Sequence, residues 1–191
     1  MIFNLPNIVT LVRILLIPLI VGVFYLPDTW LSWENRNLVA TAIFILAAVT
    51  DWLDGYLART LNQTSAFGAF LDPVADKLVV VGALIVLLTL GRVDMVVGLI
   101  IIGREIAISA LREWMAQVGQ ARSVAVAMVG KVKTVGQMIA IPLLLFHDEL
   151  LGIVDTQWLG TILINIAAVL TVISMLYYMR RASVSDRPDG Q

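Results

Sequence analysis

Six long apolar stretches, separated by short polar connections, dominate the pattern of hydrophobic and polar positions along the chain. A helix that crosses a bilayer needs about 20 predominantly apolar residues. The stretches predict six membrane-spanning helices, at about residues 9–26, 37–58, 69–90, 95–115, 124–146 and 158–179. No repeat or linker interrupts the pattern, so we expect an all-α, polytopic membrane protein with a single transmembrane domain over residues 1–191 and a polar tail from about residue 182.

The composition supports this assignment and excludes several classes of function. Of the 191 residues, 60% are hydrophobic and only 14% are charged, and the mean hydropathy is +0.92, which is high for a soluble globular domain. The chain has no cysteine, so disulfides and thiolate chemistry are excluded. The net charge of −1 gives no general attraction to nucleic acid, and we expect no such partner.

Two pairs of aspartates interrupt the second and third apolar stretches. Asp51 and Asp54 lie three residues apart and Asp72 and Asp76 four apart, so on helices each pair projects from one face. Carboxylates near hydrocarbon cost several kcal/mol unless they are paired, hydrated or ligated. The two helices follow each other directly and should pack antiparallel, which brings all four carboxylates to one depth. Oxygen ligands of this kind suit Mg²⁺ or Mn²⁺, and Mg²⁺ often shares its site with substrate phosphates.

The distribution of basic residues predicts the orientation. An even number of spans places both termini on one side of the membrane. The connections after the second and fourth spans and the C-terminal tail carry Arg59, Arg112, Arg122, Arg180, Arg181 and Arg187. The other connections contain only Arg36 and Arg92 as basic residues. By the positive-inside rule, we expect both termini and the aspartates on the cytoplasmic side.

The acidic segment also has fixed small and basic positions. From Asp51 to Asp76 it matches the pattern D-x2-D-G-x2-A-R-x8-G-x3-D-x3-D at all eight fixed positions. The chain therefore resembles the CDP-alcohol phosphotransferase family. The resemblance implies a six-helix membrane enzyme with the fold of that family, usually a homodimer, in which two divalent cations bridge the aspartates and the pyrophosphate of a CDP-linked lipid.

The resemblance also implies roles for individual residues. The metal ligands would be Asp51, Asp54, Asp72 and Asp76, and Asp76 would also be the general base. The contacts to the CDP-lipid would come from Asn7, Thr10, Gly55, Arg59, Ser65 and Gly68. From the residues alone, the glycines are explained equally well by close helix packing, and Arg59 by anchoring at the membrane surface.

Basic residues in the second half of the chain predict a second site. Arg104 and Arg112 lie eight residues apart and share a helix face, whereas Lys131 and Lys133 lie two apart, so we expect at most one lysine to join them. One interpretation pairs the arginines with neighbouring glutamates for structure. The other is a pocket for a phosphate on the acceptor, since the planar fork of arginine binds phosphate through two hydrogen bonds.

Longer segments narrow the resemblance to one branch of the family. Residues 7–13, 69–77, 104–106 and 130–134 resemble bacterial phosphatidylglycerophosphate synthases. This branch implies transfer of a phosphatidyl group from CDP-diacylglycerol to sn-glycerol 3-phosphate, with release of CMP, at the bacterial inner membrane. A phosphate-bearing acceptor is also what the basic residues favour.

Two alternatives stay open on the sequence. Membrane carboxylates also line ion pathways in transporters, although transport explains neither the fixed glycine, alanine and arginine positions nor the basic residues. Within the enzyme class, the alternative is a sister enzyme whose acceptor is inositol phosphate, serine or a second phosphatidylglycerol. His147, in an outer connection beside acidic residues, is expected to be solvated rather than a metal ligand.

Overall fold

The computed structural model describes residues 5–60, 65–117, 128–150 and 152–185. In this part of the chain each predicted stretch corresponds to one α-helix, with ends that differ from the prediction by a few residues. The helices are α1 (Leu5–Val23), α2 (Trp33–Thr60), α3 (Ala66–Thr89), α4 (Met95–Gln117), α5 (Met128–Phe146) and α6 (Thr156–Ser185). A two-stranded antiparallel hairpin, which the hydropathy pattern did not predict, joins the last two helices through β1 (Glu149–Leu150) and β2 (Val154–Asp155).

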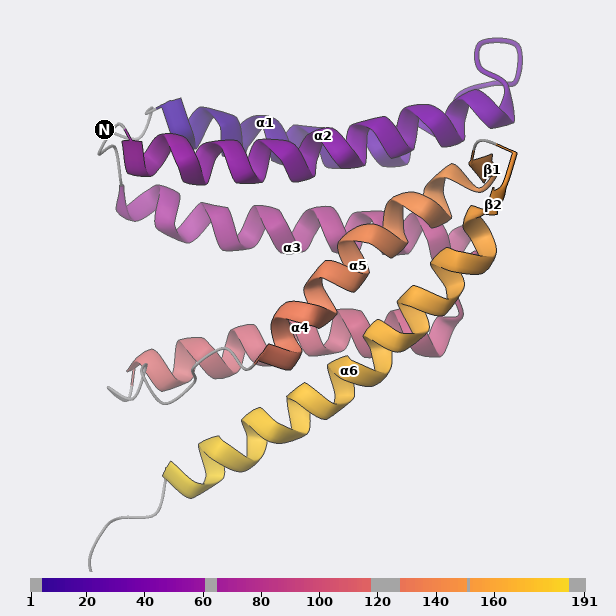
Figure 1. Cartoon of the computed structure of the whole chain (residues 1–191). Coiled ribbons are helices and arrows are strands. Elements are labelled where there is room, and N and C mark those ends of the chain that lie inside the picture. Colours follow the sequence, from indigo (N-terminus) through magenta and orange to yellow (C-terminus); the bar gives the residue numbers. More distant parts are fainter. Residues whose placement is uncertain (1–4, 61–64, 118–127, 151, 186–191) are drawn as a thin grey trace, which may run out of the picture.

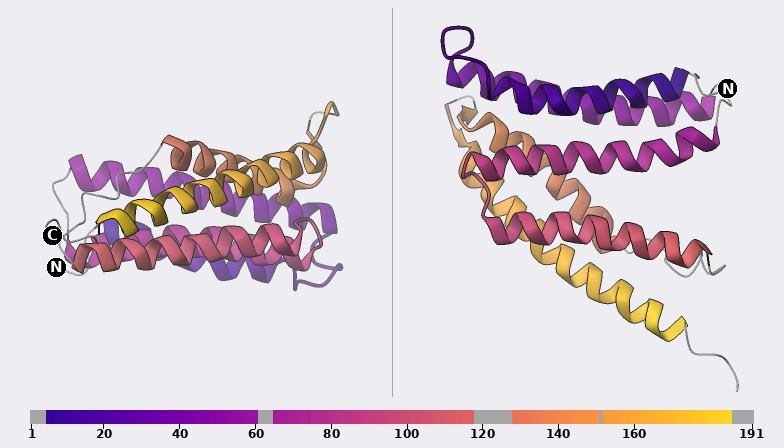
Figure 2. Two further views of the ribbon diagram at one scale, coloured as in Figure 1. Left: turned by 90° about the horizontal axis from the view of Figure 1, so that it is seen from below. Right: turned by 180° about the vertical axis from the view of Figure 1, so that it is seen from behind.

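The helices run alternately in opposite directions, and three of them form a tight group (Figure 1). Helix α1 packs against both α2 and α3, while α5 and α6 pack against each other. The contact of α5 with α2 joins this pair to the group of α1, α2 and α3, and α4 packs against α6. Figure 2 shows α5 and α6 crossing the other helices obliquely. The C-terminal part of α2 and the N-terminal part of α3 thereby lie at the same end of the bundle, where the sequence predicts the acidic site.

Polar side chains are buried in this bundle while large apolar ones are exposed. Leu15, Leu19, Leu99 and Val169 are more than half exposed. The buried polar side chains of α1 and α5 are Asn7, Thr10, Arg13, Lys133 and Gln137. An apolar exterior around buried polar groups is the arrangement expected of helices surrounded by lipid, because hydrocarbon gives polar groups no partners.

One helix among the described residues is long and apolar enough to cross a membrane by composition alone. It is the segment Thr156–Leu176 of α6, and the apolar segments Asn7–Val23 and Val132–Phe146 are shorter. Charged residues interrupt the apolar sequences of α3 and α4. One clear span is therefore shown, and the count of six stays a prediction.

A buried arginine, Arg92, links two helices at the end of the bundle opposite the aspartates. Gly91 turns the chain after α3 with a φ of 68°, and Arg92 follows. Its guanidinium donates to the carbonyls of Leu144 and Leu145 at 3.1 and 2.8 Å and to Asn37 Oδ1 at 2.8 Å. Burial lowers the pKa of Arg92 to about 10, so it remains protonated at neutral pH. It thus joins the end of α5 to α2.

His147 lies next to this network, and it is less solvated than the sequence predicted. The side chain is partly buried, and the backbone has a φ of 51°, in the left-handed region. Burial, followed by the nearby positive charge of Arg92, lowers the pKa of His147. The imidazole is therefore a structural group that favours its neutral form.

Candidate functional site

One face of α1 carries three buried polar side chains at a spacing of three residues. They are Asn7, Thr10 and Arg13, which we call the α1 polar stripe. A spacing of three places them on successive turns of one helix face. The amide nitrogen of Asn7 donates to Ser65 Oγ at 3.0 Å, and the hydroxyl of Thr10 donates to Asp72 Oδ1 at 2.7 Å. The stripe therefore fastens α1 to the N-terminal part of α3.

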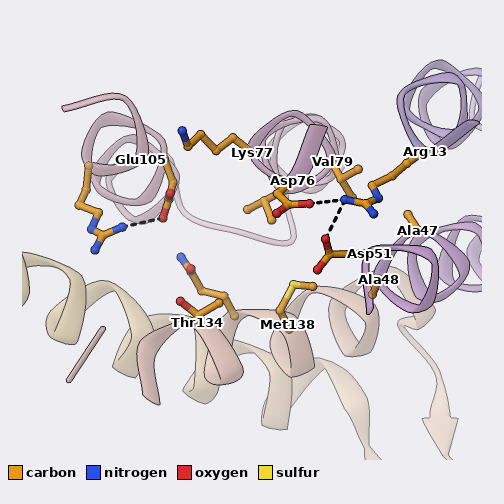
Figure 3. Close-up of a pocket in the computed structure, with 13 residues that line it drawn as sticks. Arg13, Ala47, Ala48, Asp51, Asp76, Lys77, Val79, Glu105, Thr134 and Met138 are labelled. Carbon is orange, nitrogen blue, oxygen red and sulfur yellow. Dashed lines mark hydrogen bonds and ion pairs between the residues drawn. The ribbon is translucent and has the colours of Figure 1, made fainter. Parts of the chain in front are cut away.

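The third member of the stripe connects two of the predicted metal ligands. Nη1 of Arg13 donates to Asp51 Oδ1 at 2.8 Å and also to Asp76 Oδ1. The arginine side chain is 1% exposed, whereas those of Asp51 and Asp76 are 44% and 47% exposed. Figure 3 shows the two carboxylates reaching toward Arg13 from α2 and α3. Arg13 thus brings Asp51 and Asp76 together, whereas Asp72 bonds to Thr10 and does not line the cavity described below.

The start of α3 is fixed by a serine cap and a close contact with α1. Ser65 caps the helix by accepting a hydrogen bond from the amide of Gly68 at 3.0 Å, which satisfies a backbone donor of the first turn. A Cβ atom on Gly68 would lie 2.4 Å from Asn7 Oδ1. Glycine therefore leaves room here for the side-chain amide of Asn7 between the two helices.

Several predicted site residues have side chains outside the part of the chain that the structure describes. In α2 these are Asp54, Gly55 and Arg59, and in α4 and α5 they are Arg112 and Lys131. Their backbones continue the helices that carry the described site residues. Their predicted roles therefore stay predictions.

A basic group from α4 and α5 faces the acidic one. Glu105 Oε1 accepts a hydrogen bond from Nζ of Lys133 and another from Nη1 of Arg104 at 3.1 Å. The side chain of Lys133 is 1% exposed and that of Arg104 10%. Arg104 and Lys133 were both predicted for the acceptor pocket, and a glutamate holds them together, as the structural interpretation of the arginines also required. Two cations and one carboxylate leave this cluster with one excess positive charge.

Residues of both groups line one cavity of about 260 Å³, although Lys133 itself is not part of the lining. Asp51 and Asp76, bonded to Arg13, form one side of the cavity, and Glu105 lies opposite (Figure 3). Arg104, which is bonded to Glu105, also lines the cavity. The polar residues of the lining that the sequence interpretation did not assign to the site are Arg13, Lys77, Glu105, Thr134 and Gln137. Two signals could have identified Arg13: it is a charge within an apolar stretch, and it continues the spacing of the polar residues 7 and 10.

The carboxylates that face the cavity suit a hard divalent cation. The partly exposed carboxylates of Asp51 and Asp76 face the cavity, each with one oxygen bonded to Arg13. Mg²⁺ and Mn²⁺ prefer carboxylate oxygens of this kind. Among the side chains that the structure describes, no group of three or more His, Cys, Asp or Glu residues is close enough to enclose an ion. Asp51 and Asp76 are therefore the two predicted ligands that the structure brings together, and the set of four aspartates stays a prediction.

Comparisons with known proteins place the chain. The sequence model of the CDP-alcohol phosphatidyltransferase family matches residues 3–173 of this chain. Proteins named CDP-diacylglycerol--glycerol-3-phosphate 3-phosphatidyltransferase from Shigella flexneri serotype 5b and Escherichia coli K12 are each 47% identical over 188 residues, which cover 94% of this chain and 95% of the relative. The protein of that name from Salmonella choleraesuis is 46% identical over the same length. With its acidic motif intact and this similarity over almost its whole length, the chain belongs to the CDP-alcohol phosphatidyltransferase family.

Proposed function

We propose that this protein transfers the phosphatidyl group of CDP-diacylglycerol to sn-glycerol 3-phosphate, giving phosphatidylglycerophosphate and CMP. The names of its relatives state this pair of substrates. The observation that carries the proposal is that the carboxylates of Asp51 and Asp76 line the same cavity as Arg104, whose partner Glu105 also bonds to Lys133. The acidic side suits a metal-bound pyrophosphate, and the basic side suits the phosphate of the acceptor.

Four aspartates are proposed to hold the metal. Divalent-metal dependence is general in this family, and the ligands would be Asp51, Asp54, Asp72 and Asp76. We propose two ions, Mg²⁺ or Mn²⁺, in each active site. Such ions, when bound, neutralise the charge that grows on the pyrophosphate as CMP leaves.

The chain's own carboxylate is proposed to handle the proton. Asp76 would take the proton from the attacking hydroxyl of glycerol 3-phosphate, which a general base must reach directly or through one water. The hydroxyl oxygen then forms a bond to the phosphorus of the phosphatidyl group. The bond from that phosphorus to the oxygen of CMP breaks, and CMP leaves with the electron pair. The substitution is direct, without a covalent enzyme intermediate.

The two substrates are proposed to occupy different sides of the cavity. The CDP-lipid would contact Asn7, Thr10, Gly55, Arg59, Ser65 and Gly68. The acceptor phosphate would bind to Arg104, Arg112, Lys131 and Lys133. Support for the second group comes from Arg104 and Lys133, which share Glu105 and leave a positive charge on the side of the cavity away from Asp76.

Apolar hollows next to the cavity support a lipid substrate. One hollow of about 310 Å³ lies between α2 and α5 and shares Ala48 and Met138 with the polar cavity. A second, of about 500 Å³, continues along the same two helices and shares Ile45, Met138 and Pro142 with the first. A polar cavity followed by two apolar hollows matches a ligand with a charged head group and a hydrocarbon tail.

The membrane arrangement is part of the proposal. All six helices are proposed to span the bacterial inner membrane as one catalytic domain, with both termini and the cavity on the cytoplasmic side. The alternating directions of the helices support this arrangement (Figure 1), as does the apolar exterior. The protein is proposed to act as a homodimer.

Release of CMP tests the reaction. Purified protein is incubated with CDP-diacylglycerol and Mg²⁺, and with glycerol 3-phosphate, inositol phosphate, serine or no acceptor. We expect release with glycerol 3-phosphate alone and its loss in Asp76→Asn. Release with another acceptor would overturn the assignment of the acceptor, and no release with any acceptor would overturn the enzymatic function.

A further inference from the structure

We propose that Arg13 is a positioning residue that orients Asp51 and Asp76 for metal binding. The inference rests on the proposed function in so far as these aspartates are its metal ligands. Arg13 belongs to none of the ligand groups assigned above. It lies on α1, while the two carboxylates come from α2 and α3.

The geometry of the contact sets the orientation of both carboxylates. One nitrogen, Nη1, donates to one oxygen of each aspartate. A charged donor that bonds both groups holds each at a fixed rotation. Since the arginine is buried and the carboxylates are about half exposed to the cavity, their remaining surface faces the space where a cation would bind.

The neighbouring member of the α1 polar stripe repeats this arrangement. Thr10 lies one turn earlier and donates to one oxygen of Asp72. The stripe therefore bonds the three predicted metal ligands whose side chains the structure describes, Asp51, Asp72 and Asp76. In other metal sites, groups that hydrogen-bond to the metal ligands fix the orientation of those ligands. Substitution of such a group typically lowers metal affinity or activity by about 10- to 100-fold.

The charge and the geometry of Arg13 can be separated experimentally. Arg13→Lys keeps the positive charge, but a single ammonium on a shorter side chain cannot reproduce both hydrogen bonds. Arg13→Gln removes the charge as well. Arg92→Gln is the matched control, because Arg92 is also a buried arginine but donates to two carbonyls and an amide at the other end of the bundle.

Binding of Mn²⁺ to the detergent-solubilised full-length protein, followed by electron paramagnetic resonance, tests the inference without turnover. We expect both Arg13 variants to bind Mn²⁺ about 10- to 100-fold more weakly, and Arg92→Gln to bind it like the wild type. Thr10→Val, which keeps the shape of the side chain but removes the donor to Asp72, should also bind Mn²⁺ more weakly. If an Arg13 variant does not fold, Thr10→Val still tests whether the stripe supports metal binding.

Three outcomes would overturn the inference. They are wild-type affinity in the Arg13 variants, equal weakening in Arg92→Gln, and rescue of full affinity by Arg13→Lys, which would mean that charge alone matters. Mn²⁺ binding that depends on Arg13 in a protein that releases no CMP would overturn the proposed function while supporting the inference. The two failures are therefore distinguishable.

Discussion

Replacement of Gly68 by alanine is the most direct test of how the site is held together. The new Cβ would lie 2.4 Å from Asn7 Oδ1 and 3.2 Å from Ser65 Oγ. An ordinary contact begins at 3.4 Å, so Asn7 must move by about 1 Å. Its side chain is buried and bonded to Ser65, and it cannot simply rotate into solvent. We expect α1 to shift away from α3.

The size of this shift decides its effect on the site. The hydrogen bond from Thr10 to Asp72 is 2.7 Å long, and such bonds rarely exceed about 3.0 Å. A shift of about 1 Å would therefore break it. Misplacement by that amount can reduce turnover about 100-fold, and overpacking of this kind costs about 1–3 kcal/mol of unfolding free energy. For a chain of this length the melting temperature would fall by about 2–12 °C.

The assay compares four variants for CMP release and for thermal unfolding in detergent: Gly68→Ala, Gly22→Ala, Asn7→Ala and the double variant of residues 7 and 68. Gly22→Ala is the control on α1, because a Cβ there meets nothing within 4 Å and alanine favours a helix by about 0.5–1 kcal/mol. In the double variant Asn7→Ala with Gly68→Ala the clash is removed, so its loss of stability should be smaller than the sum of the single losses. Stabilities that add within about 0.5 kcal/mol, or a Gly68→Ala protein that behaves like Gly22→Ala, would refute the reasoning.

Three further predictions concern other parts of the molecule. The pKa of His147 is lowered in the folded state, so its contribution to stability is present above pH 6.5 and is lost as the pH falls through the folded value. His147→Asn, in which asparagine tolerates the positive φ, should reduce the dependence of the melting temperature on pH between pH 7.5 and 5. An unchanged pH dependence would contradict this. Arg92→Gln should lower the unfolding free energy by about 2–4 kcal/mol, because carbonyls lose a charged donor, and should leave the KM for both substrates unchanged at low temperature. Arg104→Ala should raise the KM for glycerol 3-phosphate about tenfold or more while CDP-lipid binding changes little, and equal loss of both would show a structural role.

Local patterns in the sequence predicted the elements and the acidic side of the site. Hydropathy over about 20 residues depends only on neighbouring side chains, and the apolar stretches correspond to the helices that are described. The spacing of Asp72 and Asp76 placed both on one helix face. The order of the helices predicted that Asp51 and Asp76 lie at one end of the bundle, where both bond to Arg13 of α1. The short hairpin between α5 and α6 was not predicted, because two-residue strands have too little pattern to detect.

Contacts between helices that are distant in sequence were decided only by the tertiary structure. The sequence shows that Arg13 interrupts an apolar helix, but only the rotation of α1 against α2 and α3 places Nη1 on two carboxylates. Likewise, Glu105 is bonded to a lysine that lies 28 residues away, in α5. Arg92 could be counted as a loop charge, yet packing buries it. Helix formation is fixed by nearby residues, whereas these partners depend on how whole helices pack, and no short stretch of sequence carries that information.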